Sequence, residues 1–260
     1  MKHLFLILTV LWGSNSISQN GLVTYGHKQS MGMGGPIGID YNAALQFNTT
    51  CSLYIFAQDA LEGGSVNKTE TIRKNKNKVF VKQKFSLPEG FQYYTDRKTQ
   101  TLMSRDLGLV YVKEQIPEIH WKISDDTKTI GNFNCIKATA AFRGRAYTAW
   151  FTTEIPLPYG PWKLQGLPGL ILEAYDTNKE VYFYFKSIKY PLDTKTSIQA
   201  PDPKTEQKDW ISFAEYKQGL IEAHNRAIEN GRMFMEDFDA EENAEEKTMA
   251  DSYIEVFDEN

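Results

Sequence analysis

The chain has 260 residues, of which 13% are aromatic, and a formal net charge of −4 at pH 7. This length suits one large all-β domain or two small domains, and it is sufficient to bury a core without many covalent cross-links. Neither GxGxxG nor the phosphate-binding pattern GxxxxGKS/T occurs, so nucleotide chemistry has no support. We expect no nucleic-acid partner.

The first residues have the parts of a secretory signal peptide. A positively charged start precedes a nearly continuous apolar stretch at 4–12, and Ser16 and Ser18 then supply small residues at the spacing of a cleavage site. The apolar stretch is shorter than the roughly 20 residues of a transmembrane helix, and no later stretch approaches that length. We predict a signal peptide over 1–18 and an exported protein, periplasmic or secreted, that begins at Gln19 and has no transmembrane segment.

The sequence contains two cysteines, Cys51 and Cys135. An exported chain meets oxidising conditions in which a disulfide persists, but sequence spacing does not say whether the two backbones approach each other. The pair is therefore a possible disulfide. The alternatives are two buried thiols that pack as small apolar side chains and a reactive pair, for which the CxxC spacing is missing.

The first half of the mature chain includes a glycine-rich loop at 30–38 and a basic connection at 67–78. Segments rich in β-branched and aromatic residues then follow one another at intervals of roughly 8 to 12 residues, separated by turn formers. These predicted strands are 79–85, 91–96, 100–105, 107–114 and 118–123. The pattern is typical of an antiparallel meander.

Two hairpins continue the meander, and they pair 134–142 with 146–153 and 170–175 with 181–188. In the last of these strands Val181, Phe183 and Phe185 alternate with more polar residues, so one face is apolar and the other amphipathic. The predicted fold class is mainly β: a curved antiparallel meander sheet, or a partly open barrel-like sheet, with one long C-terminal helix.

That amphipathic helix is predicted at about 209–230. Ser212 and Glu215 have the spacing of a capping box at its start, apolar residues recur every three or four positions, and Gly231 stands where a helix often stops. We expect the helix to lie against the sheet and to complete a single β-rich domain over 19–235.

The charge is distributed unevenly along the chain. Residues 236–260 contain eleven acidic residues and one lysine, a charge of −10, which leaves +6 for residues 1–235. Acidic tails of this kind are usually solvated and mobile, so we predict a disordered tail. The alternative is a tail that folds back on basic positions such as Lys82 and Lys84.

A proline-rich stretch at 154–168 separates the two hairpins. Its prolines remove backbone donors and fix φ, so the stretch must be an extended, stiff connection rather than regular sheet. Gly166 and Gly169 flank a Leu-Pro pair, which predicts a tight turn with a positive φ or a close backbone approach. Two hypotheses follow: a structural corner of the fold, or a binding loop in which Tyr159 and Trp162 present their rings to a partner.

The stretch that contains this connection resembles the core of the GLPGLI family, which is named for a hexapeptide found here at 166–171. The pieces "GLVTY", "ALQFNTTCSLY" and "KTIGNFNC" fit the family pattern in order, so the resemblance covers roughly 21–188. The motif residues are Gly160, Pro161, Gly166, Leu167, Pro168, Gly169, Leu170 and Ile171. The resemblance implies a secreted or cell-envelope β-rich protein of Gram-negative bacteria, and it supplies no activity and no catalytic residues.

Local catalytic motifs are absent. HExxH and GxSxG do not occur, and the mature chain has three histidines. Paired carboxylates are the groups that a glycosidase uses, but the 33 acidic residues offer too many pairs to single one out. An enzyme is therefore the less favoured class, and we predict no catalytic residue and no cofactor.

Aromatic side chains are the first candidates for a binding site. Trp121, Trp150 and Trp162, together with Tyr159, have rings that stack well on a ligand, although large aromatic residues in a β-rich protein most often lie in the core.

A weaker candidate is a copper site. His27, Met31 and Met33 lie close together in the sequence, and imidazole and thioether groups are ligands that Cu(I) favours. Methionine is also common in flexible apolar contacts, and three ligands without a fourth make a weak motif.

The function that the sequence favours is a non-catalytic secreted or cell-envelope protein that binds an envelope protein or receptor, a peptide, or a glycan. The alternatives are a glycan or peptide hydrolase acting through carboxylates on the sheet face, and a structural envelope component. A hydrolase should cluster Asp and Glu side chains in a deep pocket, whereas a binding protein should show an apolar or aromatic groove.

Overall fold

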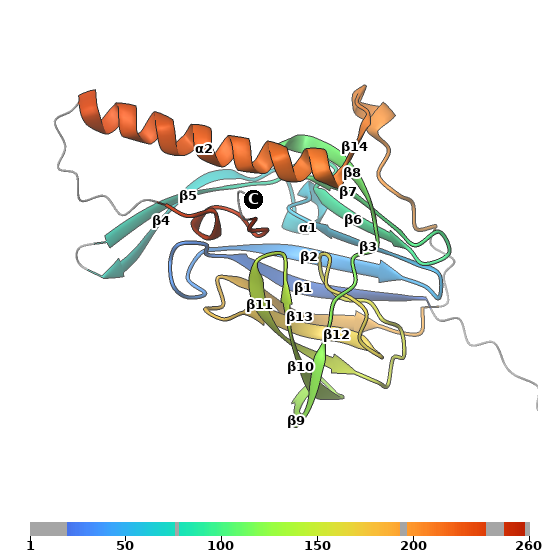
Figure 1. Cartoon of the computed structure of the whole chain (residues 1–260). Helices are drawn as coiled ribbons and strands as arrows, with labels where there is room; N and C mark the ends of the chain where they lie inside the picture. Colours follow the sequence, from blue (N-terminus) through green and yellow to red (C-terminus); the bar gives the residue numbers. More distant parts are fainter. Residues whose placement is uncertain (1–19, 76–77, 193–196, 238–246, 258–260) are drawn as a thin grey trace, which may run out of the picture.

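The protein is built around one large open sheet. The computed structural model describes residues 20–75, 78–192, 197–237 and 247–257, so the signal peptide predicted at 1–18 lies outside the described residues. The sheet has 12 strands, and a separate two-stranded sheet lies beside it. The long helix α2 (Phe213–Asp237) and the C-terminal segment 247–257 lie on the same side of the large sheet (Figure 1).

The first half of the sheet follows the order of the chain, and each strand pairs antiparallel with the next. Its strands are β1 (Gly21–Gln29), β2 (Ile39–Phe47), β3 (Cys51–Phe56), β6 (Phe91–Asp96), β7 (Thr101–Asp106) and β8 (Val110–Gln115). A four-residue helix, α1 (Asp59–Glu62), follows β3.

The second half is also an antiparallel meander. Its strands are β9 (Lys122–Ile130), β10 (Phe133–Phe142), β11 (Arg145–Thr152), β12 (Leu170–Asp176) and β13 (Val181–Lys189). The last strand, β13, pairs with β1 and joins the two halves. The three-residue β14 (Trp210–Ser212) adds in parallel to β8, so the sheet runs from β14 to β9 and stays open.

The structure confirms the predicted fold class, and both predicted hairpins are present. The strand predicted at 107–114 begins later, because Leu107–Leu109 forms a 3-10 helix, η1, in which Gly108 has a φ of 75°. The strand predicted at 118–123 is also displaced, to β9. The basic connection predicted at 67–78 is wrong: β4 (Asn67–Asn75) and β5 (Lys78–Phe85) form the separate hairpin, which projects from the body (Figure 1).

Helix α2 has the predicted capping box, but it begins at Phe213 rather than at about 209, because Trp210–Ser212 forms β14, and it ends later than predicted. The Glu215 carboxylate accepts from the backbone and hydroxyl of Ser212 at 2.7 Å each, and the Ser212 hydroxyl accepts from Glu215 N–H at 3.2 Å, which is the capping box. The predicted stop at Gly231 is wrong, because the helix continues to Asp237. A single glycine costs about 1 kcal/mol in a helix, and the good helix formers around it offset that cost.

Alternating residues of the strands bury one face of the sheet, which we call the inner face, and leave the other face, the outer face, partly exposed. On β13, Val181 and Phe183 are buried while Tyr182 and Tyr184 are half-buried. The inner face holds the main apolar core, and a smaller core of Val112, Tyr216, Leu220 and Met249 lies beneath α2.

The C-terminal segment 247–257 is part of this packing, so the prediction of a disordered tail over 236–260 is wrong for these residues. Met249 and Ile254 are buried, and the side chain of Glu255 is 1% exposed. The Arg145 guanidinium donates to the backbone carbonyls of Ala250, Tyr253 and Ile254 at 2.6 to 3.0 Å. The prediction rested on the high acidic content of the tail. The buried residues Met249, Ile254 and Glu255 instead determine where the segment lies.

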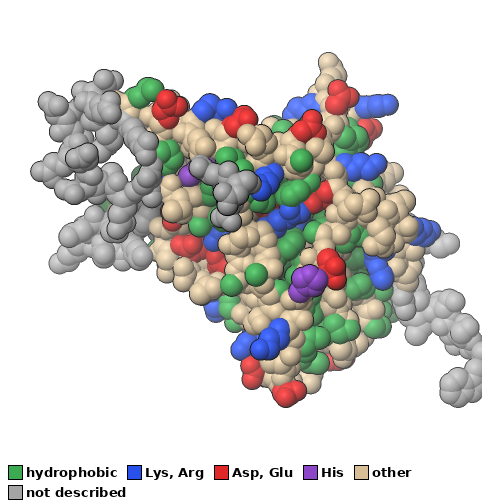
Figure 2. All heavy atoms as spheres, in the orientation of Figure 1, with side chains coloured by type: hydrophobic (Ala, Val, Ile, Leu, Met, Phe, Trp, Pro, Cys, Tyr) green, Lys and Arg blue, Asp and Glu red, His purple; other side chains and the backbone are tan. Residues whose placement is uncertain are grey.

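Charged side chains of both signs are interspersed over the face of the molecule shown in Figure 2. Within the described part of the chain, no helix is long and apolar enough to cross a membrane.

Candidate functional site

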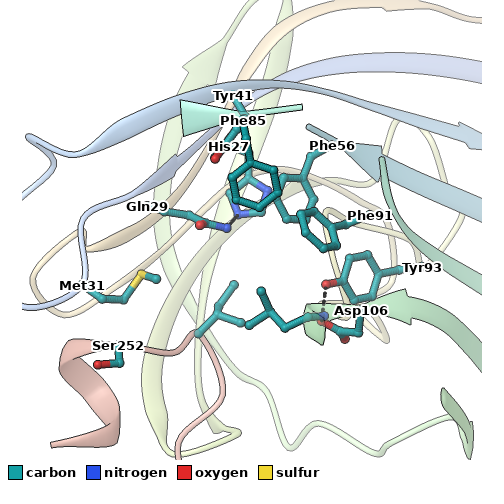
Figure 3. Close-up of a pocket in the computed structure, with 12 residues that line it drawn as sticks. His27, Gln29, Met31, Tyr41, Phe56, Phe85, Phe91, Tyr93, Asp106 and Ser252 are labelled. Carbon is teal, nitrogen blue, oxygen red and sulfur yellow. Dashed lines mark hydrogen bonds between the residues drawn. The ribbon is translucent and has the colours of Figure 1, made fainter. Parts of the chain in front are cut away.

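A cavity of about 90 Å³ opens on the inner face of the sheet (Figure 3). We call it the aromatic pocket, because half of the residues that line it have ring side chains. These rings belong to His27, Tyr41, Phe56, Phe85, Phe91 and Tyr93. Figure 3 shows them grouped on one side, with Gln29, Met31 and Ser252 on the other.

Strand pairing places the rings of the pocket. His27 on β1 lies opposite Tyr41 on β2, and Phe56 on β3 lies opposite Phe91 on β6. Because alternate residues of a strand share a face, Phe91 and Tyr93 both point inward. The ring centroids of His27 and Phe56 are 4.1 Å apart, and those of Phe56 and Phe91 are 5.0 Å apart.

His27 is fully buried and held by protein partners on both ring nitrogens. Its Nδ1 lies 3.2 Å from the Tyr54 hydroxyl, and its Nε2 lies 3.2 Å from the Gln29 side-chain nitrogen. Burial lowers the pKa of His27 from 6.5 to about 3, so the ring is neutral near neutral pH. A histidine with so low a pKa is a poor general base at pH 7.

A charged cluster lies next to the pocket. Lys163, whose side chain is 0% exposed, has its Nζ 2.5 Å from Glu255 Oε1, 3.4 Å from Glu114 Oε1 and 3.6 Å from Asp106 Oδ2. Arg143 pairs with Glu114. We call these five residues the buried charged cluster.

Two cations face three carboxylates within the cluster. Burial acts to lower the pKa of Lys163, but the three surrounding carboxylates hold that pKa above its ordinary value. Burial raises the pKa of Glu255, and Lys163 opposes that shift. The Lys163 ammonium is therefore charged, and the three carboxylates around it are engaged in ion pairs with it.

The pocket and the cluster share Asp106, which accepts a hydrogen bond from the pocket residue Tyr93. The Tyr93 hydroxyl donates to Asp106 Oδ1 at 3.0 Å, while Lys163 stands near Oδ2. Asp106 is the one carboxylate among the residues that line the pocket, and both of its oxygens face protein groups. The arrangement suits ligand binding between rings better than acid–base catalysis, which requires a carboxylate free to exchange a proton with substrate.

The connection between β11 and β12 crosses the inner face, and the burial of its rings favours the structural-corner hypothesis. Tyr159 and Trp162, the predicted binding residues, are 1% and 3% exposed. The Trp162 ring centroid lies 5.7 Å from that of Phe142 and 6.5 Å from that of Phe183. The binding-loop hypothesis is therefore wrong for these two rings, because both are part of the core.

The hexapeptide glycines have two different roles. Gly166 has a φ of 94°, the left-handed region that favours glycine. Gly169 has no positive φ, but a Cβ there would lie 2.1 Å from the carbonyl oxygen of Thr152. The same close approach occurs at Gly160, where a Cβ would lie 2.6 Å from the Leu164 carbonyl oxygen. Of the remaining motif residues, Pro161, Leu167, Leu170 and Ile171 are buried, and Pro168 is exposed.

The other two predicted tryptophans lie elsewhere. Trp121 is half-buried and donates its indole N–H to the Gln165 carbonyl at 2.8 Å, so it fixes the same connection. Trp150 is half-buried on the outer face, where the Lys128 ammonium lies 4.4 Å from its ring centroid. The structure does not bring these tryptophans together at one site.

The possible disulfide between Cys51 and Cys135 is not formed. Both thiols are free and buried. Cys51 is on β3 and Cys135 on β10, and five strands of the sheet separate those two strands. Burial raises the pKa of Cys135 to about 11, which keeps it as a protonated, unreactive thiol.

The residues suggested for copper do not form a ligand set around one point. His27 and Met31 both line the aromatic pocket, but Met33 does not. Both nitrogens of His27 already face protein partners. In the described part of the chain, no group of three or more His, Cys, Asp and Glu side chains is arranged to hold a metal ion.

Sequence reasoning singled out His27 and Met31 of the pocket, as copper candidates, and missed the other residues of the pocket and all of the cluster. Phe56 and Phe91 come together only through the pairing of β3 with β6. Lys163 gave one local signal, since a lysine between Trp162 and Leu164 interrupts an apolar run.

Comparisons with known proteins give a short family match and a distant structural likeness. Residues 143–173 match a family model described as "Protein of unknown function (Porph_ging)". No curated protein sequence matches.

Two solved structures are similar in part, each titled as a structure of PNGF-II. For the P21 crystal form the TM-score is 0.49 and the identity 15%, over 77% of this chain and 33% of the other. For the C2 form the values are 0.47 and 14%, over 76% and 32%. The chain thus spans about a third of the length of the structures that it resembles.

Proposed function

We propose that this chain is a non-catalytic exported protein, periplasmic or secreted, that binds a protein or peptide partner by taking one uncharged, largely apolar group into the aromatic pocket. The observation that supports this most directly is a cavity lined on one side by aromatic rings from paired strands. Sites for small ligands are typically concave and apolar, with a few polar groups that fix orientation.

The size of the cavity indicates what fits in it. Pockets for drug-sized ligands hold about 300 to 1,000 Å³, and an engineered cavity of about 150 Å³ accepts benzene. The aromatic pocket, at about 90 Å³, suits a single aliphatic side chain or a group of that size.

Charges around the pocket favour an uncharged group. The Lys84 ammonium lies 5.3 Å from the Tyr41 ring centroid and pairs with Glu62 at 2.9 Å. On the other side, Lys163 stands 3.6 Å from Asp106. A cationic ligand would meet two resident cations, and an anionic one would meet Asp106 beside a neutral His27.

The hydrolase alternative has less support. Asp106, Glu114 and Glu255 do cluster, but Lys163 and Arg143 face them and the side chains are nearly inaccessible. A hydrolase acting on a glycosidic bond needs two carboxylates that flank the bond, and only Asp106 of this cluster reaches the pocket wall.

A peptide library displayed on phage and selected on the full chain tests the binding proposal. Selected peptides should share an apolar residue, and Met31→Trp, which enlarges a side chain at the pocket wall, should weaken their binding at least tenfold. Met233→Trp places the same substitution on an exposed position of α2 and should leave binding unchanged. Selected peptides that bind Met31→Trp as tightly as the original chain would contradict the proposal.

We also propose that the chain is exported and that it belongs to the GLPGLI family. The residue pattern at 1–18 supports export, and mass spectrometry of the processed protein should find Gln19 as the first residue. The GLPGLI hexapeptide at 166–171 lies within the matched residues 143–173 and supports membership of that family. Recovery of the intact N-terminus from an exporting cell would contradict the export proposal.

A further inference from the structure

The outer face of the sheet carries a row of partly exposed aromatic rings that the proposed function does not use. Trp150 lies on β11, Tyr175 on β12, and Tyr182 and Tyr184 on β13. Each is half-buried, whereas the strand neighbours Ala149, Ala174 and Phe183 are buried on the inner face. We call these four residues the outer aromatic strip.

Three of the rings are contiguous. Tyr175 lies opposite Tyr182 in the β12–β13 ladder, with ring centroids 5.9 Å apart. The rings of Tyr182 and Tyr184 are 5.3 Å apart on β13. Trp150 extends the row on β11, where it lies opposite Glu173 of β12.

Tyr184 is fixed against the sheet. It lies opposite Gly26 of β1, and a Cβ at that glycine would be 2.0 Å from the Tyr184 ring, so the ring occupies the space above the glycine. Its hydroxyl donates to Asp40 Oδ2 at 2.7 Å. Held at both points, the ring is ordered before a ligand arrives, which lowers the entropy cost of stacking on it.

Lysines accompany every ring of the strip. The Lys128 ammonium lies 4.4 Å from the Trp150 ring centroid, that of Lys179 lies 4.5 Å from Tyr175, and that of Lys186 lies 5.5 Å from Tyr184. Lys128 also pairs with Glu173. Within the described residues, Lys179 and Lys186 pair with no carboxylate, so this part of a chain with a net charge of −4 carries unneutralised positive charge.

We propose that the outer aromatic strip binds an anionic oligosaccharide. The C–H faces of pyranose rings stack on aromatic rings, and Tyr and Trp combine a large apolar face with a polar group. Asp40 and Glu173 accept hydrogen bonds from sugar hydroxyls. Carboxylate or sulfate groups on the sugar pair with Lys179 and Lys186, which draws these ammonium groups off the rings on which they rest.

Single-stranded nucleic acid is the competing ligand, because bases also stack on aromatic residues and phosphates pair with lysine. The carboxylates of Asp40 and Glu173 lie among the rings, where they can accept hydrogen bonds from hydroxyl groups, and DNA offers few of these. The strip therefore suits a hydroxyl-rich sugar better than single-stranded DNA.

Fluorescence anisotropy with three labelled ligands tests this on the full chain: an octamer of galacturonic acid, a neutral maltooctaose, and a twelve-nucleotide single-stranded DNA. The galacturonate should bind best, and its affinity should fall with added salt. Tyr184→Ala should weaken that binding at least tenfold, and Lys186→Gln severalfold with a shallower salt dependence.

Tyr94→Ala and Lys113→Gln are the matched controls, on β6 and β8 at the other half of the sheet, and both should bind as the original chain does. Melting curves should show that the variants are folded. Met31→Trp in the aromatic pocket should also leave galacturonate binding unchanged, which separates this proposal from the peptide-binding one. The proposal is overturned by absence of galacturonate binding at millimolar concentration, by equal binding of maltooctaose, or by tighter binding of DNA.

Discussion

The aromatic pocket and the buried charged cluster lie side by side and share Asp106, but most of their other residues come from different kinds of backbone. Four paired strands, β1, β2, β3 and β6, carry most of the pocket rings. The cluster takes Lys163 from the irregular connection between β11 and β12, and Glu255 from the C-terminal segment.

The difference shows how each region is held. Ladder hydrogen bonds fix a strand residue whatever lies opposite its side chain, so the pocket rings surround empty space without losing their positions. The C-terminal segment has the hydrogen bond from Val256 N–H to the Arg143 carbonyl, at 3.0 Å, and depends otherwise on side chains. Damage to the cluster should therefore cost more stability than damage to the pocket.

Removing residues 247–260 should have the largest effect. The truncation deletes the buried side chains of Met249 and Ile254, each worth about 2–5 kcal/mol, and leaves Lys163 without its nearest carboxylate. Since whole domains are stable by only about 5–15 kcal/mol, the truncated chain should lose its cooperative thermal transition in circular dichroism. Melting within two degrees of the full chain would show that the segment is dispensable.

Acid should destabilise the pocket side through His27. Its folded pKa of about 3 lies below the ordinary 6.5, so the neutral ring contributes stability above pH 6.5 that is lost as the pH falls toward 3. The full loss is about 5 kcal/mol. Compared with the original chain, His27→Phe should show a smaller fall in the free energy of unfolding between pH 6 and 4, measured by urea denaturation. Equal slopes for the two chains would contradict this assignment.

Lys163→Met should cost about 3–5 kcal/mol, because it leaves three buried carboxylates with Arg143 as their remaining cation. The deficit should be larger at pH 8 than at pH 5, since the raised pKa of Glu255 makes its protonated form easier to bury as the pH falls. Lys98→Met, at an exposed position, should stay within about 0.5 kcal/mol of the original chain. Equal denaturation midpoints for Lys163→Met and Lys98→Met would contradict the assignment of a stabilising role to the cluster.

Two glycine substitutions should have small effects of opposite sign. Gly169→Ala should destabilise by about 1–3 kcal/mol, because the new Cβ would lie 2.1 Å from the Thr152 carbonyl oxygen in a packed region. A Cβ added at Gly231 would meet no atom within 4 Å. Because this position lies inside α2, Gly231→Ala should stabilise the protein by about 0.5–1 kcal/mol. Thermal melts of both variants that shift in the same direction would contradict the described geometry.

The sequence was informative where local chemistry determines the structure. Ser212 and Glu215 marked the start of α2, and the prolines and glycines of the connection indicated a stiff corner. Alternation of apolar and polar residues identified the hairpins of β10 to β13. Each of these signals acts within a few residues, so no knowledge of the tertiary structure was needed.

The pocket and the cluster depend on distant residues. The prediction lacked β1, β2 and β3, and therefore the registers that set His27 beside Tyr41 and Phe56 beside Phe91. Lys163 and Glu255 meet only because the connection and the C-terminal segment both return to the inner face. The tail prediction rested on the number of acidic residues, and the sequence did not show that one of them, Glu255, pairs with the buried Lys163.

Because the large sheet never closes, its two terminal strands keep backbone donors and acceptors to which a strand of another chain can bind. The terminal strand β9 is mostly exposed, and Lys122, Asp125, Asp126 and Lys128 place charges on both of its sides. Charged residues at such an edge oppose the addition of a further strand. At the other end, β14 has three residues and offers a very short template. The open architecture thus carries its own protection against fibrillar aggregation.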